Sequence, residues 1–500
     1  MRHFSISRTL AFSAVVASVV FLLPCVVLSQ SNSNSNSNSN DDLLDRINRL
    51  EGRAQAQDEL IQNLQHQLTV SDEARESGEL ELAVNGLLND LEGGGGVTTP
   101  RSERLLVGGQ LRLRAEARDP KNYGSGIRDD VDFVIQRTRL TFDFRVHDNV
   151  RVFVELQDSR NWGEEGSTVG DLEGVDLHQG YVDFSHVFGR PWTIRVGRQS
   201  LSFGDQRLVS PLDWHPVGRA WDGVRTWYDA DDFTIDLFVT NVVENSTLLG
   251  GQTDDDHIFA GVYLTTKVFA DHELDVYVFY RRFGSNSFRA EDGTIDDLED
   301  VTLGFRFSGK QGGFDYSAEA DLQLGDRAGD DVTAYAWAVT VGYHFGGNWN
   351  PRIGLEWTFA SGDDDPTDGD YETFDPLFPF GHAFQGYADL FAWRNGHDLA
   401  VKVEASPTQD LWFQVAGHMF ILDSDKDAWY NAGGGVIRRT TAGNVSNTVG
   451  FELDVHFKYN LNPSTSLWFG WSHFFAGDYV EDTGSSPDTD FGFFQVTINF

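Results

Sequence analysis

The chain closes on Phe491-Gly492-Phe493-Phe494-Gln495-Val496-Thr497-Ile498-Asn499-Phe500, in which apolar and polar side chains alternate up to a terminal phenylalanine. Similar segments recur from about residue 109 onward, separated alternately by tight turns and by longer acidic loops. Alternation over about ten residues suits a strand with one face against lipid and the other against a water-filled lumen. A soluble sandwich also alternates, but many repeats ending in an aromatic strand favour a membrane barrel. The sequence therefore predicts an all-β fold, a transmembrane antiparallel β-barrel over residues 105–500.

Composition supports this fold class and excludes others. The net charge of −39 argues against nucleic acid as a partner. After residue 30, no run approaches the roughly 18 apolar residues that a transmembrane helix requires. A chain of this kind can cross lipid only as a closed barrel, because an open sheet edge leaves peptide groups unsatisfied there. Outer-membrane lipid is therefore the first expected partner.

The N-terminus predicts export. Residues 1–29 read as a signal peptide, with a basic start, an apolar core from Leu10 to Leu23 and a cleavage site after Ser29. Cys25 follows Pro24 where a lipoprotein signal needs a small residue, so lipidation is not expected. Residues 30–40 form a Ser-Asn linker of low complexity. The mature chain would contain no cysteine and hence no disulfide.

Residues 41–92 predict an α-helical coiled coil, which we expect in the periplasm. Apolar positions recur alternately four and three residues apart, as coiled-coil packing requires. The positions are Leu43, Ile47, Leu50, Ala54, Gln57, Ile61, Leu64 and Leu68. The coil could build a homo-oligomer, contact the cell wall, or be one amphipathic helix on another surface. Residues 93–104 form a Gly-rich linker between the coil and the barrel.

The alternating segments predict about 18 strands. The predicted strands span 109–118, 131–146, 149–157, 177–187, 191–199, 221–229, 232–243, 257–269, 272–283, 300–309, 313–324, 332–345, 350–360, 397–406, 409–422, 447–459, 464–475 and 490–500. Short connections all fall at one end with both termini, and long connections at the other, as in outer-membrane barrels. A nineteenth segment, Ala383 to Trp393, would break this parity, so we assign it to a long or inward-folded loop.

Charged side chains fall on one face of each predicted strand. Charge on a lipid face costs about 2–4 kcal/mol near the midplane, so these faces must line the lumen. Trp192, Tyr228, Tyr459 and Phe500 fall on the other face at the short-turn end, where an aromatic girdle belongs. The first three strands carry more arginine than acid on their inner faces, which favours an anion pathway. The alternative is that these arginines only pair with lumen carboxylates such as Glu116, Asp143, Glu155 and Asp183.

Three stretches resemble the alginate export family of outer-membrane porins. They are Gly197-Arg198-Gln199-Ser200-Leu201 continuing to Arg225, Ser361-Gly362-Asp363 continuing to Phe391, and Ser472-His473-Phe474-Phe475-Ala476-Gly477-Asp478-Tyr479. The resemblance implies an 18-stranded monomeric barrel that passes anionic uronate polysaccharide through an arginine-rich constriction. It adds Arg198, Arg207, Arg219 and Arg225 as constriction residues. The coil and the Ser-Asn linker are not part of the family pattern.

Together these arguments predict an outer-membrane channel for anionic, alginate-like polysaccharide or oligosaccharide. The alternative is a general or anion-selective porin for small solutes. The predicted substrate pathway consists of Arg112, Arg114, Arg137, Arg139, Arg145, Arg151, Arg195, Arg198, Arg207, Arg219, Arg225 and Arg352. No catalytic, cofactor or metal site is predicted: His215, His382 and His473 stand in isolated aromatic contexts, and the acidic run Asp363 to Asp370 lacks the register of a calcium loop.

Overall fold

The computed structural model describes residues 104–119, 123, 131–162, 174–243, 253–269, 271–440 and 445–500. The chain divides into two compact units, residues 1–98 and 99–500, and all described residues belong to the second. The expected signal peptide, Ser-Asn linker and coiled coil, and all but the end of the Gly-rich linker, lie outside the described residues.

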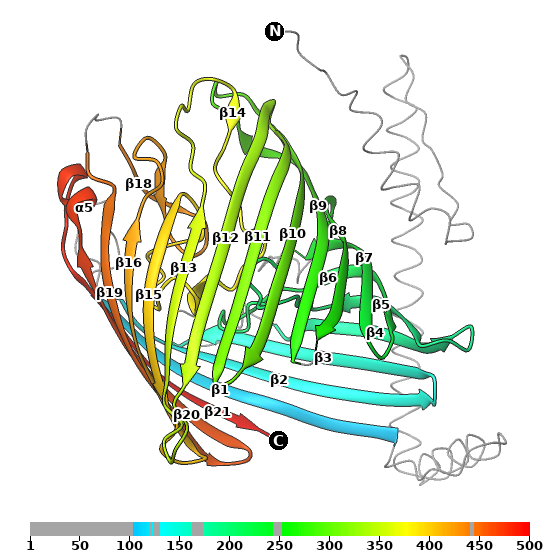
Figure 1. Ribbon diagram of the computed structural model, residues 1–500. Coiled ribbons are helices and arrows are strands. Elements are labelled where there is room, and N and C mark those ends of the chain that lie inside the picture. Colours follow the sequence, from blue (N-terminus) through cyan, green and yellow to red (C-terminus); the bar gives the residue numbers. More distant parts are fainter. Residues whose placement is uncertain are drawn as a thin grey trace, which may run out of the picture. The chain divides into compact units, whose positions relative to one another are not determined.

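Eighteen strands form a closed antiparallel barrel in chain order, which confirms the predicted fold class and strand number (Figure 1). The barrel strands are β1 (Leu105–Asp119), β2 (Val131–His147), β3 (Val150–Asn161), β4 (Asp176–Val187), β5 (Trp192–Gln199), β6 (Trp221–Asp229), β7 (Phe233–Val243), β8 (Thr253–Phe269), β9 (His272–Arg289), β10 (Ile295–Gln311), β11 (Phe314–Arg327), β12 (Asp330–His344), β13 (Arg352–Ala360), β15 (Gly396–Ala405), β16 (Leu411–Ile421), β19 (Thr448–Asn462), β20 (Thr465–Ala476) and β21 (Thr489–Asn499). The loops add β14 (Asp370–Tyr371), β17 (Ala428–Tyr430), β18 (Val436–Arg439), the 3-10 turn η1 (Gly381–Ala383) and α5 (Asp478–Thr483).

The last strand closes the barrel on the first. β21 runs antiparallel to β1, with Asn499 opposite Gln110. Phe500 exchanges two backbone hydrogen bonds with Gly109, at 2.8 and 3.0 Å. A β-carbon on Gly109 would lie 2.6 Å from the Phe500 ring, so glycine is needed where the terminal ring crosses β1. The closed ladder leaves no open sheet edge along this seam.

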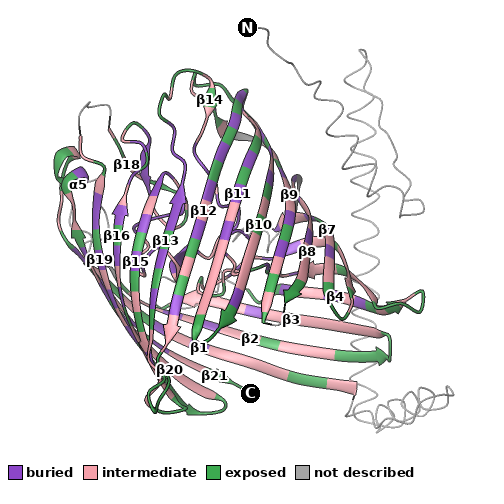
Figure 2. Ribbon diagram, viewed as in Figure 1, coloured by how far each residue is buried: buried purple, intermediate pink, exposed green. Residues whose placement is uncertain are grey.

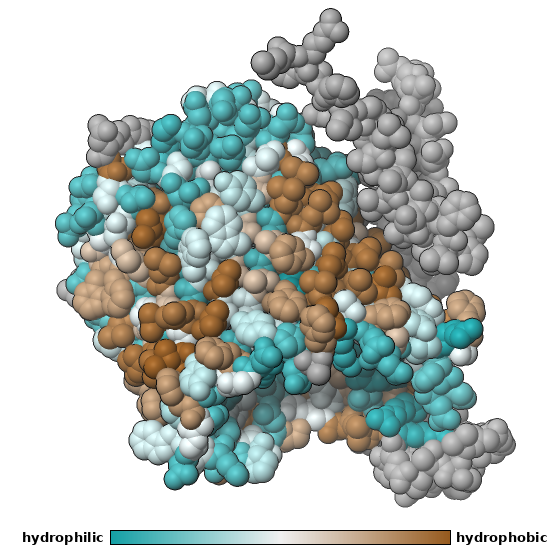
Figure 3. All heavy atoms as spheres, viewed as in Figure 1, coloured by the Kyte–Doolittle hydropathy of each residue, from teal (hydrophilic) through white to brown (hydrophobic). Residues whose placement is uncertain are grey.

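Alternation gives the wall its two faces. Buried and exposed residues alternate along β12, as Figure 2 shows. Outward side chains such as Val339 and Val341 are apolar and remain exposed on the isolated chain. In the space-filling view, apolar side chains gather over the strands, and hydrophilic ones toward the long-loop end (Figure 3). No helix in the described ranges is both long and apolar enough to cross a bilayer.

One connection corrects the expectation that every link at the long-loop end is long. β11 and β12 extend beyond their predicted limits and are joined by Ala328 and Gly329 alone. Both residues have positive φ, 54° and 105°, as a tight hairpin turn requires. β11 and β12 therefore extend farther toward the long-loop end than the sequence predicts.

Two long connections fold into the barrel and determine the shape of the lumen. The first inward segment is residues 200–220, between β5 and β6, and the second is residues 361–395, between β13 and β15. Val209 and Phe378 form a parallel bridge between them. The Ser210 amide donates to the Phe378 carbonyl at 2.9 Å, and the Phe378 amide donates to Leu208 at 2.8 Å. The predicted nineteenth segment, Ala383 to Trp393, thus belongs to an inward loop and adds no barrel strand.

The inward segments pack onto one side of the barrel through an apolar core. Leu201, Phe203, Leu208 and Val209 of the first segment are all buried there. They meet wall and second-segment residues Trp221, Phe238, Phe259, Tyr263, Tyr277, Phe279, Phe374, Leu377, Phe378 and Trp393. Burial of these aromatic side chains is favourable because each removes a large apolar surface from water. The lumen is therefore partly filled by protein.

Candidate functional site

Four arginines gather on the inner faces of β1 and β2. Arg112 and Arg114 are two residues apart on β1, and Arg137 and Arg139 are two apart on β2. The register places Arg112 opposite Arg137, so the four side chains form one cluster. Arg112, Arg114 and Arg137 are all at most 4% exposed. Alternation along the strands explains why they share a face.

This arginine cluster (Arg112, Arg114, Arg137 and Arg139) holds the first inward segment by its backbone. Arg112 donates to the carbonyl oxygens of residues 213, 214 and 215, at 2.5, 3.2 and 3.2 Å. Arg114 donates to the carbonyl of Trp214 at 2.8 Å, and Arg137 to that of residue 213 at 3.0 Å. Peptide carbonyls satisfy guanidinium donors without cancelling their charge. Three carboxylates, Glu116, Glu155 and Asp213, also lie within 4.0 Å of the cluster, so its four arginines keep an excess of one positive charge.

One carboxylate lies at the centre of the cluster. Asp213 Oδ1 is 2.9 Å from a terminal nitrogen of Arg137 and 2.9 Å from one of Arg139, and Oδ2 is 4.0 Å from Arg112. The Asp213 side chain is 60% exposed to the lumen. Arg114 instead pairs with Glu116, at 2.5 Å. Three arginines thus converge on a single, accessible carboxylate, the geometry that guanidinium groups use to recognise carboxylates.

An aromatic stack connects the cluster to both inward segments. The guanidinium of Arg114 lies 3.7 Å above the Trp214 ring, on one face. The His382 ring stacks on Trp214 at 3.9 Å with an interplanar angle of 16°. His382 Nδ1 also contacts an Asp389 carboxylate oxygen at 2.9 Å. Because η1 carries His382, this stack fixes the second segment against the first.

Most other predicted pathway arginines have a carboxylate partner. Arg151 and Arg195 share Asp183 near the short-turn end, at 3.2 and 2.7 Å. Arg225 pairs with Asp236 at 2.6 Å. Arg352 contacts Asp315 at 2.6 Å and Glu404 at 3.0 Å. For these four arginines the structure agrees with the alternative in which lumen arginine is paired with lumen acid.

Three predicted residues have other surroundings. Arg207 is buried beside Glu356, at 3.3 Å, and stacks on Phe384 at 3.9 Å. Arg219 donates to the Pro379 carbonyl at 2.8 Å and so links the two inward segments. Arg145 is exposed and lies near the short-turn end of β2, six residues beyond Arg139.

The structure corrects the placement of Arg198. Its register partner is Asp222, which it contacts at 2.8 Å. The next residues toward the short-turn end, Val196 and Val224, point outward and are 45% and 40% exposed. Gln199 and Trp221, on the opposite face, are fully buried in the lumen. Arg198 therefore lies on the outer face of the barrel and does not line the pathway.

The second inward segment covers acidic residues of β19, a strand that β20 and β21 separate from β1. The Ala388 amide donates to Glu452 at 2.8 Å, and the Tyr387 amide to Asp454 at 3.4 Å. Gly386 permits this approach, since its φ is +80° and a β-carbon there would lie 2.6 Å from Glu452. Both carboxylates are completely buried. The segment thus covers these two carboxylates, whereas the Asp213 side chain remains 60% exposed.

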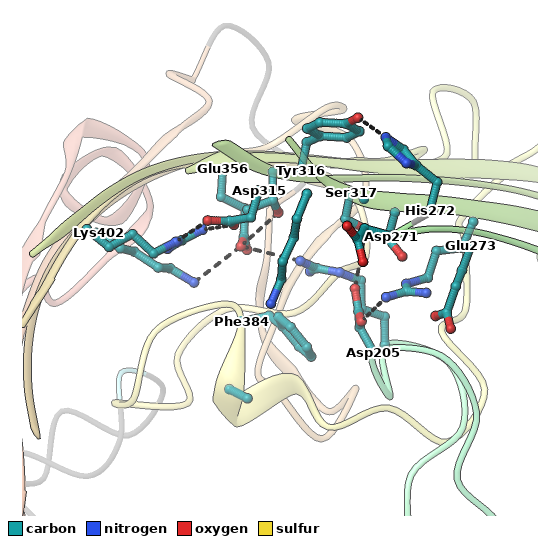
Figure 4. Close-up of a pocket in the computed structure, with 18 of the residues that line it drawn as sticks. Asp205, Asp271, His272, Glu273, Asp315, Tyr316, Ser317, Glu356, Phe384 and Lys402 are labelled. Carbon is teal, nitrogen blue, oxygen red and sulfur yellow. Dashed lines mark hydrogen bonds and ion pairs between the residues drawn. The ribbon is translucent and has the colours of Figure 1, made fainter. Parts of the chain in front are cut away.

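Two cavities of similar size lie on either side of η1. The inner cavity, at the short-turn end, measures about 680 Å³ and is lined by Arg207, Arg306, Lys402, Asp205, Glu356 and Phe384, among others. Figure 4 shows Asp205 and Phe384 reaching into it from the inward segments. The outer cavity measures about 690 Å³ and is lined by Arg118, Trp214, Arg219, His382 and Asp389, among others. Residues Gly381 to Phe384 separate the two.

Sequence comparison now identifies the family. The profile described as alginate export matches residues 103–494, which is nearly the whole described barrel. The chain belongs to the alginate export family. No curated protein matches the chain in sequence.

Solved structures share the fold of this alginate export barrel at low sequence identity. OpdQ of Pseudomonas aeruginosa is similar with a TM-score of 0.55 and 11% identity over 79% of this chain and 97% of that one. OccAB1 of Acinetobacter baumannii is similar with a TM-score of 0.54 and 14% identity over 81% of this chain and 99% of that one. The outer membrane protein OprD of Pseudomonas aeruginosa is similar with a TM-score of 0.51 and 11% identity over 81% of this chain and 97% of that one. The fold is that of these outer-membrane proteins.

Several residues of the alginate export barrel's site were not predicted from the sequence. Asp213, Trp214 and Phe384 all lie on the inward segments, which have no periodicity to orient them. The predicted isolation of the histidines does not hold for His382, which belongs to the aromatic stack, or for His473, which contacts Asp490 at 2.9 Å. Within the described residues, no group of three or more histidine, cysteine or acidic side chains could hold a metal ion.

Proposed function

We propose that the protein is an outer-membrane channel for anionic, uronate-type saccharides of the alginate kind, which pass through an arginine-lined lumen. The observation that carries this proposal is the convergence of Arg112, Arg137 and Arg139 on the Asp213 carboxylate. A carboxylate of a passing uronate residue could take the same place, because its geometry and charge are the same. Membership of the alginate export family supports the cargo class.

The outer cavity supports the same proposal. Arg118 and Arg219 line it, and Asp389 is the one acidic side chain among the described residues that do. A low-dielectric wall focuses such a local excess of positive charge on the path of an entering anion. The inner cavity has nearly balanced charge and would release the same anion more readily. Trp214 lines the outer cavity and stacks with Arg114, so an anionic chain there would lie next to the arginine cluster, where its attraction is strongest.

Single-channel recording with matched variants tests the proposal. Arg139→Gln removes one positive charge beside Asp213. The Arg139 side chain is 13% exposed. Arg145→Gln removes the same charge from the same face of β2 near the short-turn end, and serves as the control. We expect Arg139→Gln to weaken the block by oligouronates several-fold and Arg145→Gln to change it little. Equal effects of the two variants would contradict a specific site at the cluster.

A general or anion-selective porin for small solutes remains the second candidate. The favouring observation is the separation of the two cavities by Gly381 to Phe384, because each space of about 700 Å³ suits a small solute better than a polymer. Block by oligouronates of increasing length distinguishes the two. A polymer channel should bind longer oligomers more tightly, since they reach both cavities, whereas a small-solute porin should show no dependence on length.

We also propose that residues 41–92 form a periplasmic coiled coil that oligomerises the channel or contacts the cell wall. The seam of Leu43, Ile47, Leu50, Ile61 and Leu64 supports this. Deleting residues 30–92 should leave a heat-modifiable barrel that associates less in detergent. Sedimentation of the full-length protein as a monomer would exclude the oligomer and leave the cell-wall contact.

A further inference from the structure

A short strap runs between the outer and the inner cavity. The strap is residues 379–385, which include η1 and line both cavities. It is fixed at each end: Phe378 before it is bridged to the first inward segment, and the Ala388 amide after it is bonded to β19. Gly386 follows the strap directly, and its φ of +80° makes it a suitable hinge. A ligand that passes from one cavity to the other must therefore displace the strap.

Two hydrogen bonds join the strap backbone to the first inward segment. The Phe380 amide donates to the Gln206 carbonyl at 3.0 Å. A terminal nitrogen of Arg219 donates to the Pro379 carbonyl at 2.8 Å. The other backbone bonds that the described residues give the strap close its own turn. Arg219 thus provides one of the two bonds that hold the backbone of the strap in place.

The side chains of the strap are only partly satisfied in this position. His382 stacks on Trp214, and Phe384 lies against the Arg207 guanidinium. However, His382 Nε2 is buried and has no hydrogen-bond partner in the part of the chain that the structure describes. The amide nitrogen of Gln385 is buried in the same way. A buried polar group without a partner costs free energy that contact with water recovers. A displaced strap would regain this free energy in the lumen.

Arg219 has unused donors and lines the outer cavity together with Pro379. Within the described ranges, no carboxylate lies within 4.0 Å of its guanidinium, and its bond to Pro379 is the one hydrogen bond that it makes there. A guanidinium has five N–H donors and binds a carboxylate through two parallel, charge-assisted bonds. A carboxylate that pairs with both terminal nitrogens of Arg219 must take the nitrogen that now holds Pro379.

We propose that a uronate carboxylate bound at Arg219 opens the passage between the two cavities. The carboxylate replaces the Pro379 carbonyl, and the strap then swings away from the first inward segment. This inference rests on the proposed function, because it concerns the regulation of the same outer cavity. A ligand shifts an equilibrium only if it binds the two states unequally. That condition is met here, since Arg219 offers both terminal nitrogens only when Pro379 has left.

Two arginine variants separate release of the strap from a simple loss of charge. Arg219→Met removes both the bond to Pro379 and a positive charge. Arg118→Met removes the same charge from the same cavity, but Arg118 donates to the Ala388 carbonyl, beyond the strap. Loss of positive charge alone lowers the conductance for anions, whereas release of the strap raises it. Without ligand, we therefore expect the single-channel conductance to rise several-fold in Arg219→Met and to fall in Arg118→Met. A fall in both variants would overturn the inference.

Glucuronate tests the same inference on the unchanged protein, so a variant that fails to fold does not prevent the test. Glucuronate carries one carboxylate on one sugar ring, and glucose is its neutral counterpart. Added on the long-loop side, glucuronate should increase the time that the channel spends at its larger conductance several-fold, and glucose should not. Arg219→Met should no longer respond to glucuronate. A lower or unchanged conductance of the unchanged protein with glucuronate would overturn the inference.

The same recordings separate this inference from the proposed function. Block by polyuronate without any opening by glucuronate would overturn the release of the strap and leave the uronate channel supported. A reversal potential that favours cations, without block by polyuronate, would overturn the proposed function and with it the ligand at Arg219.

Discussion

At the scale of single residues, the role of each arginine depends on what it contacts. Arg112 and Arg137 bind peptide carbonyls and one carboxylate, Arg225 is paired with its own acid, and Arg198 faces outward. Alternation predicts the face of a residue, and counting three residues on from Arg195 would have placed Arg198 outside. Sequence could not supply the partners, because Asp213 lies on a segment without periodicity.

Removing the carboxylate at the centre of the cluster should increase its positive potential. Asp213→Asn keeps the shape of the side chain, and the peptide carbonyls of the segment still bind the arginines. We expect the anion-to-cation permeability ratio to rise roughly twofold, as for a charge interaction of about 0.5 kcal/mol. Reversal potentials in a salt gradient measure this ratio.

Asp143→Asn is the matched control for that experiment. Asp143 also faces the lumen and pairs with an arginine, Arg151, at 2.8 Å, but it lies outside the cluster. We expect the ratio to change less than in Asp213→Asn. If the two variants raise it equally, the selectivity comes from the total lumen charge and not from the site at Asp213.

At the scale of elements, the strands were predictable and the inward segments were not. Each strand repeats a two-residue pattern that lipid and lumen impose, so β6 and β7 match their predicted limits to within one residue. The inward segments are held by contacts between distant residues, such as Val209 with Phe378. No local pattern encodes such contacts. The alternation of short and long connections excluded Ala383 to Trp393 as a barrel strand. It did not predict where this segment would pack.

Gly386→Ala should loosen the second inward segment. The positive φ of +80° alone costs about 1 kcal/mol for alanine, and the close approach to Glu452 should bring the total to about 3 kcal/mol. The segment would shift from β19, so we also expect higher single-channel conductance. Gly346→Ala is the control: its φ is +69°, but nothing lies within 4 Å of the added carbon. Gly346→Ala should lower the stability only by the cost of the positive φ and leave the single-channel conductance unchanged. Equal conductance in the two variants would contradict a constriction at the second inward segment.

The contact between the side chains of Asp363, in the second inward segment, and Glu291, between β9 and β10, should depend on pH. Burial, with a smaller effect of the nearby Glu291, raises the pKa of Asp363 to about 7. An unfolded aspartate has a pKa of about 4, so between these values the folded loop holds the proton more tightly. The stability of the contact is therefore highest at low pH and falls as the pH rises from about 4 to 7.

Limited proteolysis of the intact protein at pH 5 and pH 8 measures that dependence. A protease active at both values should cut near residue 363 several-fold faster at the higher pH. Asp363→Asn cannot ionise and should remove the difference. If the variant keeps the pH dependence of the unchanged protein, another group is responsible.

At the scale of the whole molecule, an acidic protein carries a local cluster of arginines on the inner face of its barrel. The net charge is −39, yet three arginines converge on one accessible carboxylate in the lumen. Acidic loops are exposed to solvent, where salt screens their charge within about 8–10 Å. The arginine cluster lies inside a low-dielectric wall and is screened much less. Local placement of charge, and not the total, should decide which ions pass.

The reversal potential of the unmodified channel in a salt gradient tests this central claim most directly, with polyuronate then added as a blocker. The account predicts a potential that favours anions and a block by polyuronate that neutral oligosaccharides do not reproduce. A potential that favours cations, without any block by polyuronate, would contradict it and would mean that lumen carboxylates neutralise the arginines.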